Sequence, residues 1–234
     1  MAVDQAPIEP TEALYLVALL PPSNVARAVG DVQAELFRRY RLVSALGLGV
    51  LLPLAFCQSP PPQPRRGPAG SALLLTQAGS MRTGGLVAAR SVDPPGAGAL
   101  YLEVGASGAL AGEEGIGPER NAAWLAELRA AFPTEKGLFP LHTGLFLADL
   151  SELATRAAGS TPGPPATDAP PADGTPAAGL PGDLGALAPP APLSWGTSEL
   201  ACLALRFARA SSWWSFLCWE TVWSVRLRRA PVRD

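Results

Sequence analysis

The sequence predicts a protein of the α+β class, and two observations carry this prediction. Short apolar segments bounded by proline or glycine recur along the chain, and such segments are typical of buried β-strands. Two longer segments carry apolar residues at steps of three and four, which is the spacing of one helix face. The 234 residues are enough for one large domain or for two lobes that share a core.

The first elements predicted are a strand, a helix and a second strand. Ala13 to Leu20 is apolar and is followed by two prolines, so we expect a buried strand there. Ser23 or Asn24 can then cap a helix. A second strand should follow within Leu46 to Phe56. The predicted helix has one apolar stripe, formed by Val25, Val29, Val32, Leu36 and Tyr40.

The middle of the chain predicts an exposed loop, a second helix and further strands. Pro60 to Arg66 is rich in proline and arginine, and we expect a solvated loop there. Glu119 to Phe132 has helical spacing, with Asn121 as the candidate N-cap. The apolar face of this helix consists of Trp124, Leu125, Leu128 and Phe132. Strands are predicted at Ala72 to Gln77, Gly85 to Val92, Ala99 to Val104 and Leu138 to Leu147.

Two more strands are predicted near the C-terminus, at Glu199 to Phe207 and Phe216 to Leu227. In the second, strand alternation should put the large side chains on one face. This face consists of Leu217, Trp219, Thr221, Trp223 and Val225. Before these strands, residues 159–192 are rich in Pro, Gly and Ala and lack aromatic side chains. They cannot bury enough apolar surface to offset the entropy of ordering, so we predict a disordered insertion in one domain of residues 1–158 and 193–234.

The charge and the cysteines exclude several classes of function. The formal net charge is −2, so the chain as a whole lacks the excess of Lys and Arg that nucleic-acid binding needs, although a local basic groove is compatible with this number. Cys57, Cys202 and Cys218 show no C-x-x-C spacing and are odd in number. We therefore expect reduced thiols in a cytoplasmic protein, with no metal, no cofactor and no disulfide framework.

One apolar run raises the alternative of a membrane anchor. Leu42 to Cys57 carries no charge and follows Arg38, Arg39 and Arg41. It is shorter than the ~20 residues that span a bilayer, and Pro53 interrupts it. The sequence also contains no phosphate loop, no dinucleotide fingerprint and no nucleophile elbow.

The order of several segments is that of a known family. These segments are "ALYLVALLPPSNVARAVGDVQAELFRRY", a strand ending in "LLPLAF", "LFPLHTGLFLADLSEL", and the closing "ELACLALRF" and "VWSVRL". In pattern and order the chain resembles bacterial 2'-5' RNA ligase-like proteins, of the two-histidine phosphoesterase superfamily, over most of its length outside residues 159–192. The resemblance implies a bilobal α+β fold, in which two antiparallel sheets with outer helices face one another across a central cleft.

The resemblance also implies a chemistry. In active members of the family each lobe supplies one His-x-Thr or His-x-Ser motif on a strand. One imidazole removes a proton from the attacking group, the other protonates the leaving oxygen, and the two hydroxyls hold phosphate oxygens. Because attack and departure occur on opposite sides of phosphorus, two such groups are needed. Histidine, with a pKa of about 6.5, suits both roles.

This chain retains one of the four motif side chains. The nearest register in the first lobe places Gly49, Val50 and Leu51 where the motif should stand. In the second lobe His142, the single histidine of the chain, takes the histidine position, and Gly144 takes the threonine position. Thr143 lies one residue early, and strand alternation should turn its hydroxyl away from His142.

These losses predict a protein that is catalytically inactive or severely weakened and that binds a nucleotide or an RNA end. A general acid or base typically contributes ~10² to 10⁴ in rate, so losing one imidazole and both hydroxyls should leave little activity. A weak 2',3'-cyclic phosphodiesterase with His142 as its catalytic residue is one alternative, and a membrane-anchored protein is another. A third interpretation makes His142 an ordinary hydrogen-bonded structural residue.

Overall fold

The structure of the chain is a computed structural model, and it describes residues 11–64, 81–90, 98–106, 118–132, 134, 137–153, 191–196, 199–210 and 213–227. The elements in chain order are β1 (Thr11–Leu20), α1 (Ser23–Tyr40), α2 (Ser44–Gly47), β2 (Leu52–Cys57), β3 (Met81–Arg90), β4 (Gly98–Ala106), α4 (Pro118–Ala130), β5 (Gly144–Asp149), β6 (Ser194–Trp195), β7 (Glu199–Ala210) and β8 (Trp213–Arg226). The predicted strand at residues 72–77 and most of the predicted insertion lie outside the described residues.

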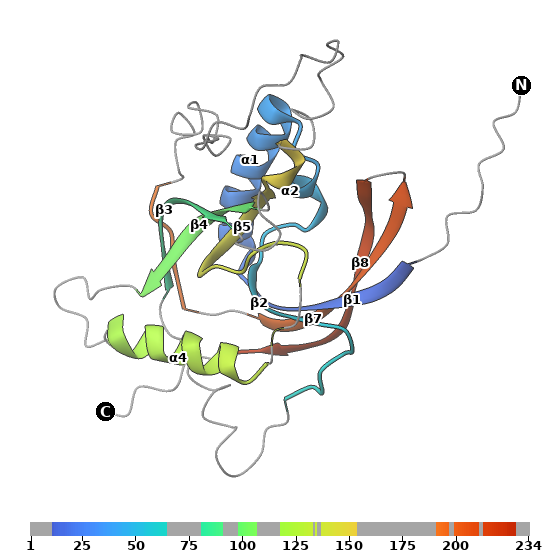
Figure 1. Cartoon of the computed structure of the whole chain (residues 1–234). Coiled ribbons are helices and arrows are strands. Elements are labelled where there is room, and N and C mark those ends of the chain that lie inside the picture. Colours follow the sequence, from blue (N-terminus) through green and yellow to red (C-terminus); the bar gives the residue numbers. More distant parts are fainter. Residues whose placement is uncertain are drawn as a thin grey trace, which may run out of the picture.

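The strands form two four-stranded antiparallel sheets (Figure 1). Sheet A has the order β2-β1-β7-β8 and joins strands from both ends of the described chain, whereas sheet B has the order β5-β4-β3-β6. Helix α1 packs against β5, and α4 packs against β4 and β2. The predicted α+β class, with two antiparallel sheets, is therefore confirmed.

Helix α1 carries the predicted apolar stripe. Val25, Val29, Val32 and Leu36 are buried, while Tyr40 is half-buried against the same core. The predicted cap is wrong, because Pro22 takes the N-cap position and makes no side-chain bond to the helix. The helix ends at Arg41, whose left-handed φ of 58° turns the chain and whose N–H donates to Phe37 O at 2.9 Å.

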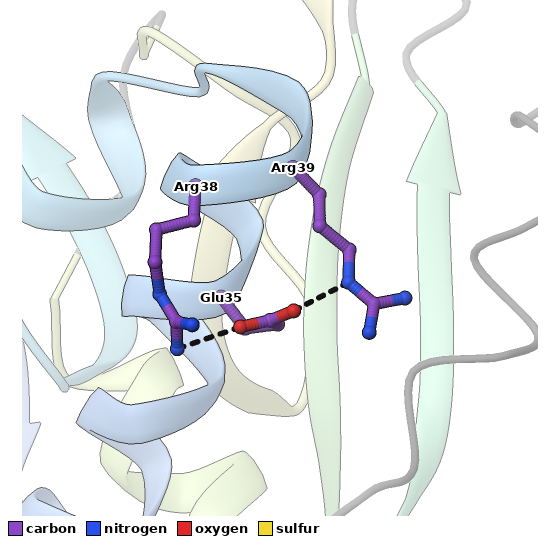
Figure 2. Close-up of polar contacts among 3 residues, drawn as sticks. All are labelled: Glu35, Arg38 and Arg39. Carbon is purple, nitrogen blue, oxygen red and sulfur yellow. Dashed lines mark hydrogen bonds and ion pairs between the residues drawn. The ribbon is translucent and has the colours of Figure 1, made fainter.

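The exposed side of α1 carries a small cluster of ion pairs. Figure 2 shows the Glu35 carboxylate between the guanidinium groups of Arg38 and Arg39, with Arg38 Nη2 2.6 Å from Glu35 Oε2. The hydrogen bond from Arg39 is the largest cause that lowers the pKa of Glu35. Exposed pairs of this kind contribute little to stability, because water screens them. They mark the solvent side of the helix.

The apolar run at residues 42–57 is part of the core. It forms α2 and β2, and Leu42, Leu51 and Phe56 are each no more than 1% exposed. Val43 and Leu46, at 55% and 52%, are its large exposed apolar side chains. Among the described residues, no helix has the length and apolar character needed to cross a bilayer.

Helix α4 and strand β8 each correct one detail of the prediction. Helix α4 begins at Pro118, a residue suited to the first helical position, so Asn121 lies inside the helix and is not its cap. In β8 a bulge skips Val222, because Trp223 pairs with Cys202 and Thr221 pairs with Leu203. The bulge puts Trp219 and Trp223 on opposite faces of the sheet. The prediction that they share a face is therefore wrong.

Cys57 and Cys202 are buried and are not joined in a disulfide. Cys57 in β2 and Cys202 in β7 have β1 between them. Two strand spacings separate their Cα atoms by ~9.5 Å, beyond the ~7 Å limit for a disulfide. Burial is the main cause that raises the pKa of the Cys202 thiol to about 11. The side chain of Cys218 lies outside the described residues.

The two sheets are built on one repeated unit of strand, helix and strand. The first copy is β1, α1 and β2, and the second is β4, α4 and β5. In each copy the second strand lies at the edge of its sheet and pairs antiparallel with the first. One bulge interrupts each pair, skipping Leu54 in β2 and Leu147 in β5. The bulges fix how the two copies correspond, residue by residue.

Candidate functional site

The repeat brings the two expected motif positions into correspondence. Gly49 lies five residues before the bulged Leu54, and His142 lies five residues before the bulged Leu147. The geometry of the strands therefore equates residues 49–51 with residues 142–144. The same pairing follows from placing the family motif on the sequence, so the register expected for the first lobe agrees with the internal repeat.

The two motif segments lie next to one another where the sheets meet. The backbone N–H of Phe146, in β5, donates to Leu51 O, just before β2, at 2.8 Å. Gln33 of α1 donates through Nε2 to Gly49 O at 3.1 Å and to Phe146 O at 3.0 Å. Because Gln33 is only 3% exposed, these bonds form in a largely dry environment.

Arg129 of α4 makes the equivalent bridge in the second copy. Its Nη2 donates to His142 O at 2.6 Å and to Pro53 O at 3.4 Å. Gln33 thus binds Gly49 in its own copy and Phe146 in the other. Arg129 binds the equivalent residues, which are His142 in its own copy and Pro53 in the other. Two side chains therefore hold the motif segments together from opposite helices.

His142 lies just before the strand and not in it, because β5 begins at Gly144. The prediction of a strand from residue 138 is wrong at this end. The Gly144 N–H donates to His142 O at 3.0 Å, and this short-range bond bends the chain before pairing starts. The imidazole is half-buried, its Nδ1 is buried without a hydrogen-bond partner, and its ring centroid is 5.6 Å from that of Tyr101.

Thr143, like His142, precedes β5, and its hydroxyl binds Arg129. Its Oγ1 accepts a hydrogen bond from Arg129 Nη1 at 2.9 Å, and Arg129 also binds the carbonyl of His142. The hydroxyl is therefore directed to the guanidinium that holds the motif segment. It contacts a cation, which is a different role from that of the strand residue expected at this position.

Each of the three positions that lack motif side chains disfavours them for a different reason. Gly49 has a φ of 70°, which a histidine would adopt only under strain. Leu51 is 1% exposed in the core between the sheets, where a threonine hydroxyl would be desolvated. A Cβ at Gly144 would lie 2.8 Å from Leu102 O and 2.9 Å from Tyr101 Cβ.

Tyr101, whose ring lies near that of His142, belongs to a cluster of aromatic rings. Phe139 is stacked on Phe146 with centroids 4.4 Å apart and meets Phe56 edge-on at 5.0 Å, while Tyr101 meets Phe146 at 5.9 Å. These rings come from β2, β4, β5 and the segment before β5, and all are buried in one core cluster with residues of both sheets. The Tyr101 hydroxyl donates to Pro140 O at 2.6 Å, and burial raises its pKa.

Sequence reasoning missed Arg129, which contacts the candidate site through His142 O and Thr143 Oγ1. It is half-buried, burial lowers its pKa, and within the described residues its guanidinium has no ion-pair partner. Its Nε is buried and has no hydrogen-bond partner in the described part of the chain. The sequence contained one indication of this contact. Arg129 lies four residues after buried Leu125, and so on the same side of the helix as its apolar face.

A buried carboxyl group, that of Asp149, lies at the end of β5. Asp149 is 1% exposed, and its Oδ1 accepts from the Ser151 N–H at 2.8 Å and from Ser151 Oγ at 2.6 Å. Its Oδ2 is buried without a partner. Burial is the largest cause that raises the pKa of Asp149 to about 6. Glu152 lies nearby and accepts the backbone N–H groups of Val43 and Ser44, at 2.7 and 2.8 Å, at the start of α2.

The described part of the chain contains no group of three or more His, Cys, Asp or Glu side chains that could hold a metal ion.

No family model, curated protein or solved structure matches this chain.

Proposed function

We propose that the chain is a 2'-5' RNA ligase-like protein with a bilobal two-histidine phosphoesterase fold that has lost catalysis and binds a nucleotide or an RNA end beside His142. The observation that carries this proposal is the internal repeat. Two strand, helix and strand units with equivalent bulges give residues 49–51 and residues 142–144 equivalent positions, and this supports a site with one motif position in each unit.

The loss of catalysis follows from what stands at the motif positions. Only His142 has a side chain that can transfer a proton, and each missing acid or base role is worth ~10² to 10⁴ in rate, or about 3 to 5.5 kcal/mol. Restoring the other groups by substitution alone is opposed by the left-handed backbone at Gly49 and by the contact at Gly144. On this proposal the backbone at these two positions opposes catalysis, in addition to the missing side chains.

The proposed binding follows from the charge that the site keeps. A half-buried guanidinium without a carboxylate partner in the described chain attracts an anion, because little water screens it. Arg129 binds the backbone carbonyl of His142, whose imidazole is half-buried. A phosphate group at a nucleotide or RNA terminus has the charge and the acceptor oxygens that these side chains bind.

The test combines turnover with binding. Purified protein is incubated with a 2',3'-cyclic nucleotide, and binding of a short oligoribonucleotide with a 3'-phosphate is measured by calorimetry. We expect no turnover, and binding that His142→Ala and Arg129→Lys each weaken about tenfold or more. Arg38→Ala, which removes an exposed arginine of α1, is the matched control and should bind as the wild type does.

Two results would contradict the proposal separately. Rapid hydrolysis by the wild type that disappears in His142→Ala would show an active phosphodiesterase and would refute the loss of catalysis. Absence of binding, or binding that the substitutions at His142 and Arg129 leave unchanged, would refute the retained ligand site. Circular dichroism on each variant separates loss of binding from loss of folding.

A further inference from the structure

A proline-rich segment of the chain is seated on the edge strand of sheet A. Residues 59–64, with the sequence SPPPQP, are here called the proline strap. The indole N–H of Trp223 in β8 donates to Pro61 O at 2.8 Å, and Gln63 Nε2 donates to Ser224 O at 3.5 Å. These bonds join residues 162 and 161 positions apart in the sequence, so the strap is fixed by tertiary contacts.

The exposure of the strap has a period of three residues. Pro61 and Pro64 are half-buried, while Pro60, Pro62 and Gln63 are exposed. A polyproline II helix has three residues per turn, so residues three apart lie on one side of it. The two half-buried residues of the strap are therefore a Pro-x-x-Pro pair, and Gln63, although exposed, also contacts the protein through its bond to Ser224 O.

The surface under the strap has the features of a receptor for such a helix. The Trp223 ring is stacked on Phe132, with centroids 6.4 Å apart and an interplanar angle of 30°. Phe132 is buried directly after α4, which fixes this pair of rings in place. Aromatic surfaces with an indole N–H aimed at a ligand carbonyl are how proline-rich peptides are bound, because proline itself offers no donor.

We propose that Trp223 and Phe132 form a binding site for peptides with the pattern Pro-x-x-Pro, which the proline strap occupies in cis and which a proline-rich segment of another protein takes when the strap is displaced. The strap itself indicates the kind of peptide that binds, since a bound segment shows which chemistry the surface accepts. This site is independent of the ligand site proposed at His142, so either one can fail without the other.

The strap competes with any external peptide. A segment tethered close to its site has an effective concentration in the millimolar range. If the peptide binds with a dissociation constant of about 0.1 mM, a strap at about 1 mM weakens the apparent affinity by about tenfold. Removing the strap from its site should therefore strengthen binding in trans by about that factor.

The experiment uses the full chain and a synthetic peptide, SPPPQPRR, which copies residues 59–66. The variant Pro61→Ser with Pro64→Ser removes the inward prolines. Its matched control, Pro60→Ser with Pro62→Ser, removes two outward prolines from the same segment. We expect the first variant to bind the peptide about tenfold more tightly than the wild type, and the control to bind as the wild type does. Adding Trp223→Phe to the first variant removes the indole N–H, keeps a ring over Phe132, and should weaken binding about tenfold.

Binding is measured by calorimetry and by the shift of the Trp223 indole resonance, assigned from the Trp223→Phe variant. A folded Pro61→Ser, Pro64→Ser variant that binds no peptide at millimolar concentration would overturn the receptor. Equal affinity of the wild type and this variant would overturn occupancy by the strap. Equal binding of a peptide with alanine at both inward prolines would overturn the Pro-x-x-Pro specificity.

Discussion

Replacing Gly144 by alanine tests whether the second motif has lost the space for its missing side chain. The added Cβ would lie 2.8 Å from Leu102 O and 2.9 Å from Tyr101 Cβ. Both neighbours belong to β4, which pairs directly with β5, so neither is the free end of a flexible side chain. Relief of the contact requires the two strands to separate by a few tenths of an ångström.

The expected cost is that of an overpacked core, about 1 to 3 kcal/mol. Alanine also restricts the unfolded chain, which returns about 0.4 to 1 kcal/mol. A net loss of roughly 1.5 kcal/mol corresponds to a fall of about 3 to 6 °C in melting temperature for a chain of this size. The threonine that the family motif carries would add two more heavy atoms and should cost more.

The matched control is Gly105→Ala, in β4. Gly105 is exposed, and a Cβ there would meet nothing within 4 Å. This variant should be neutral or slightly stabilised, because only the unfolded chain is affected. Urea unfolding followed by far-ultraviolet circular dichroism gives both free energies. Equal free energies of unfolding for the two variants would refute the argument that backbone packing excludes the motif side chain.

Two further predictions concern Asp149 and Leu51. Burial raises the pKa of Asp149 from 3.8 to about 6, so its ionised form is disfavoured in the folded protein. The free energy of unfolding should therefore fall as pH rises through this range, by up to about 3 kcal/mol between pH 4 and pH 7. Asp149→Asn should flatten this dependence in urea titrations at a series of pH values, and an unchanged slope would contradict the assignment. Leu51→Thr, which places the first-lobe motif hydroxyl in a core position that is 1% exposed, should lower the free energy of unfolding by about 2 to 3 kcal/mol without producing turnover of a cyclic nucleotide, and a gain of activity would show that the site is still competent.

Local patterns in the sequence were sufficient for most of the elements. The stripe of α1 and the strands around residues 13–20, 99–104 and 199–207 follow from the period of apolar residues, and all four were predicted. The errors lie at the ends of elements and at bulges. Pro22 and Pro118 start their helices through backbone geometry, so nearby polar side chains misled the choice of cap. The bulge at Val222 depends on how β8 pairs with β7, which no local pattern records.

In the candidate site, too, some features follow from the sequence and others from the tertiary structure alone. The sequence by itself determined that a second imidazole is absent, since a chain with one histidine has no other wherever it folds, and it placed Gly49 and His142 in equivalent registers. Only the tertiary structure decided that Gln33 and Arg129 join the two motif segments, that Thr143 binds a guanidinium, and that Gly144 lies against the backbone of β4. The physical reason is the distance along the chain over which each feature is set. Periodicity depends on neighbouring residues. These contacts instead join residues far apart in sequence, such as Gln33 and Phe146, which strand pairing and helix packing bring together.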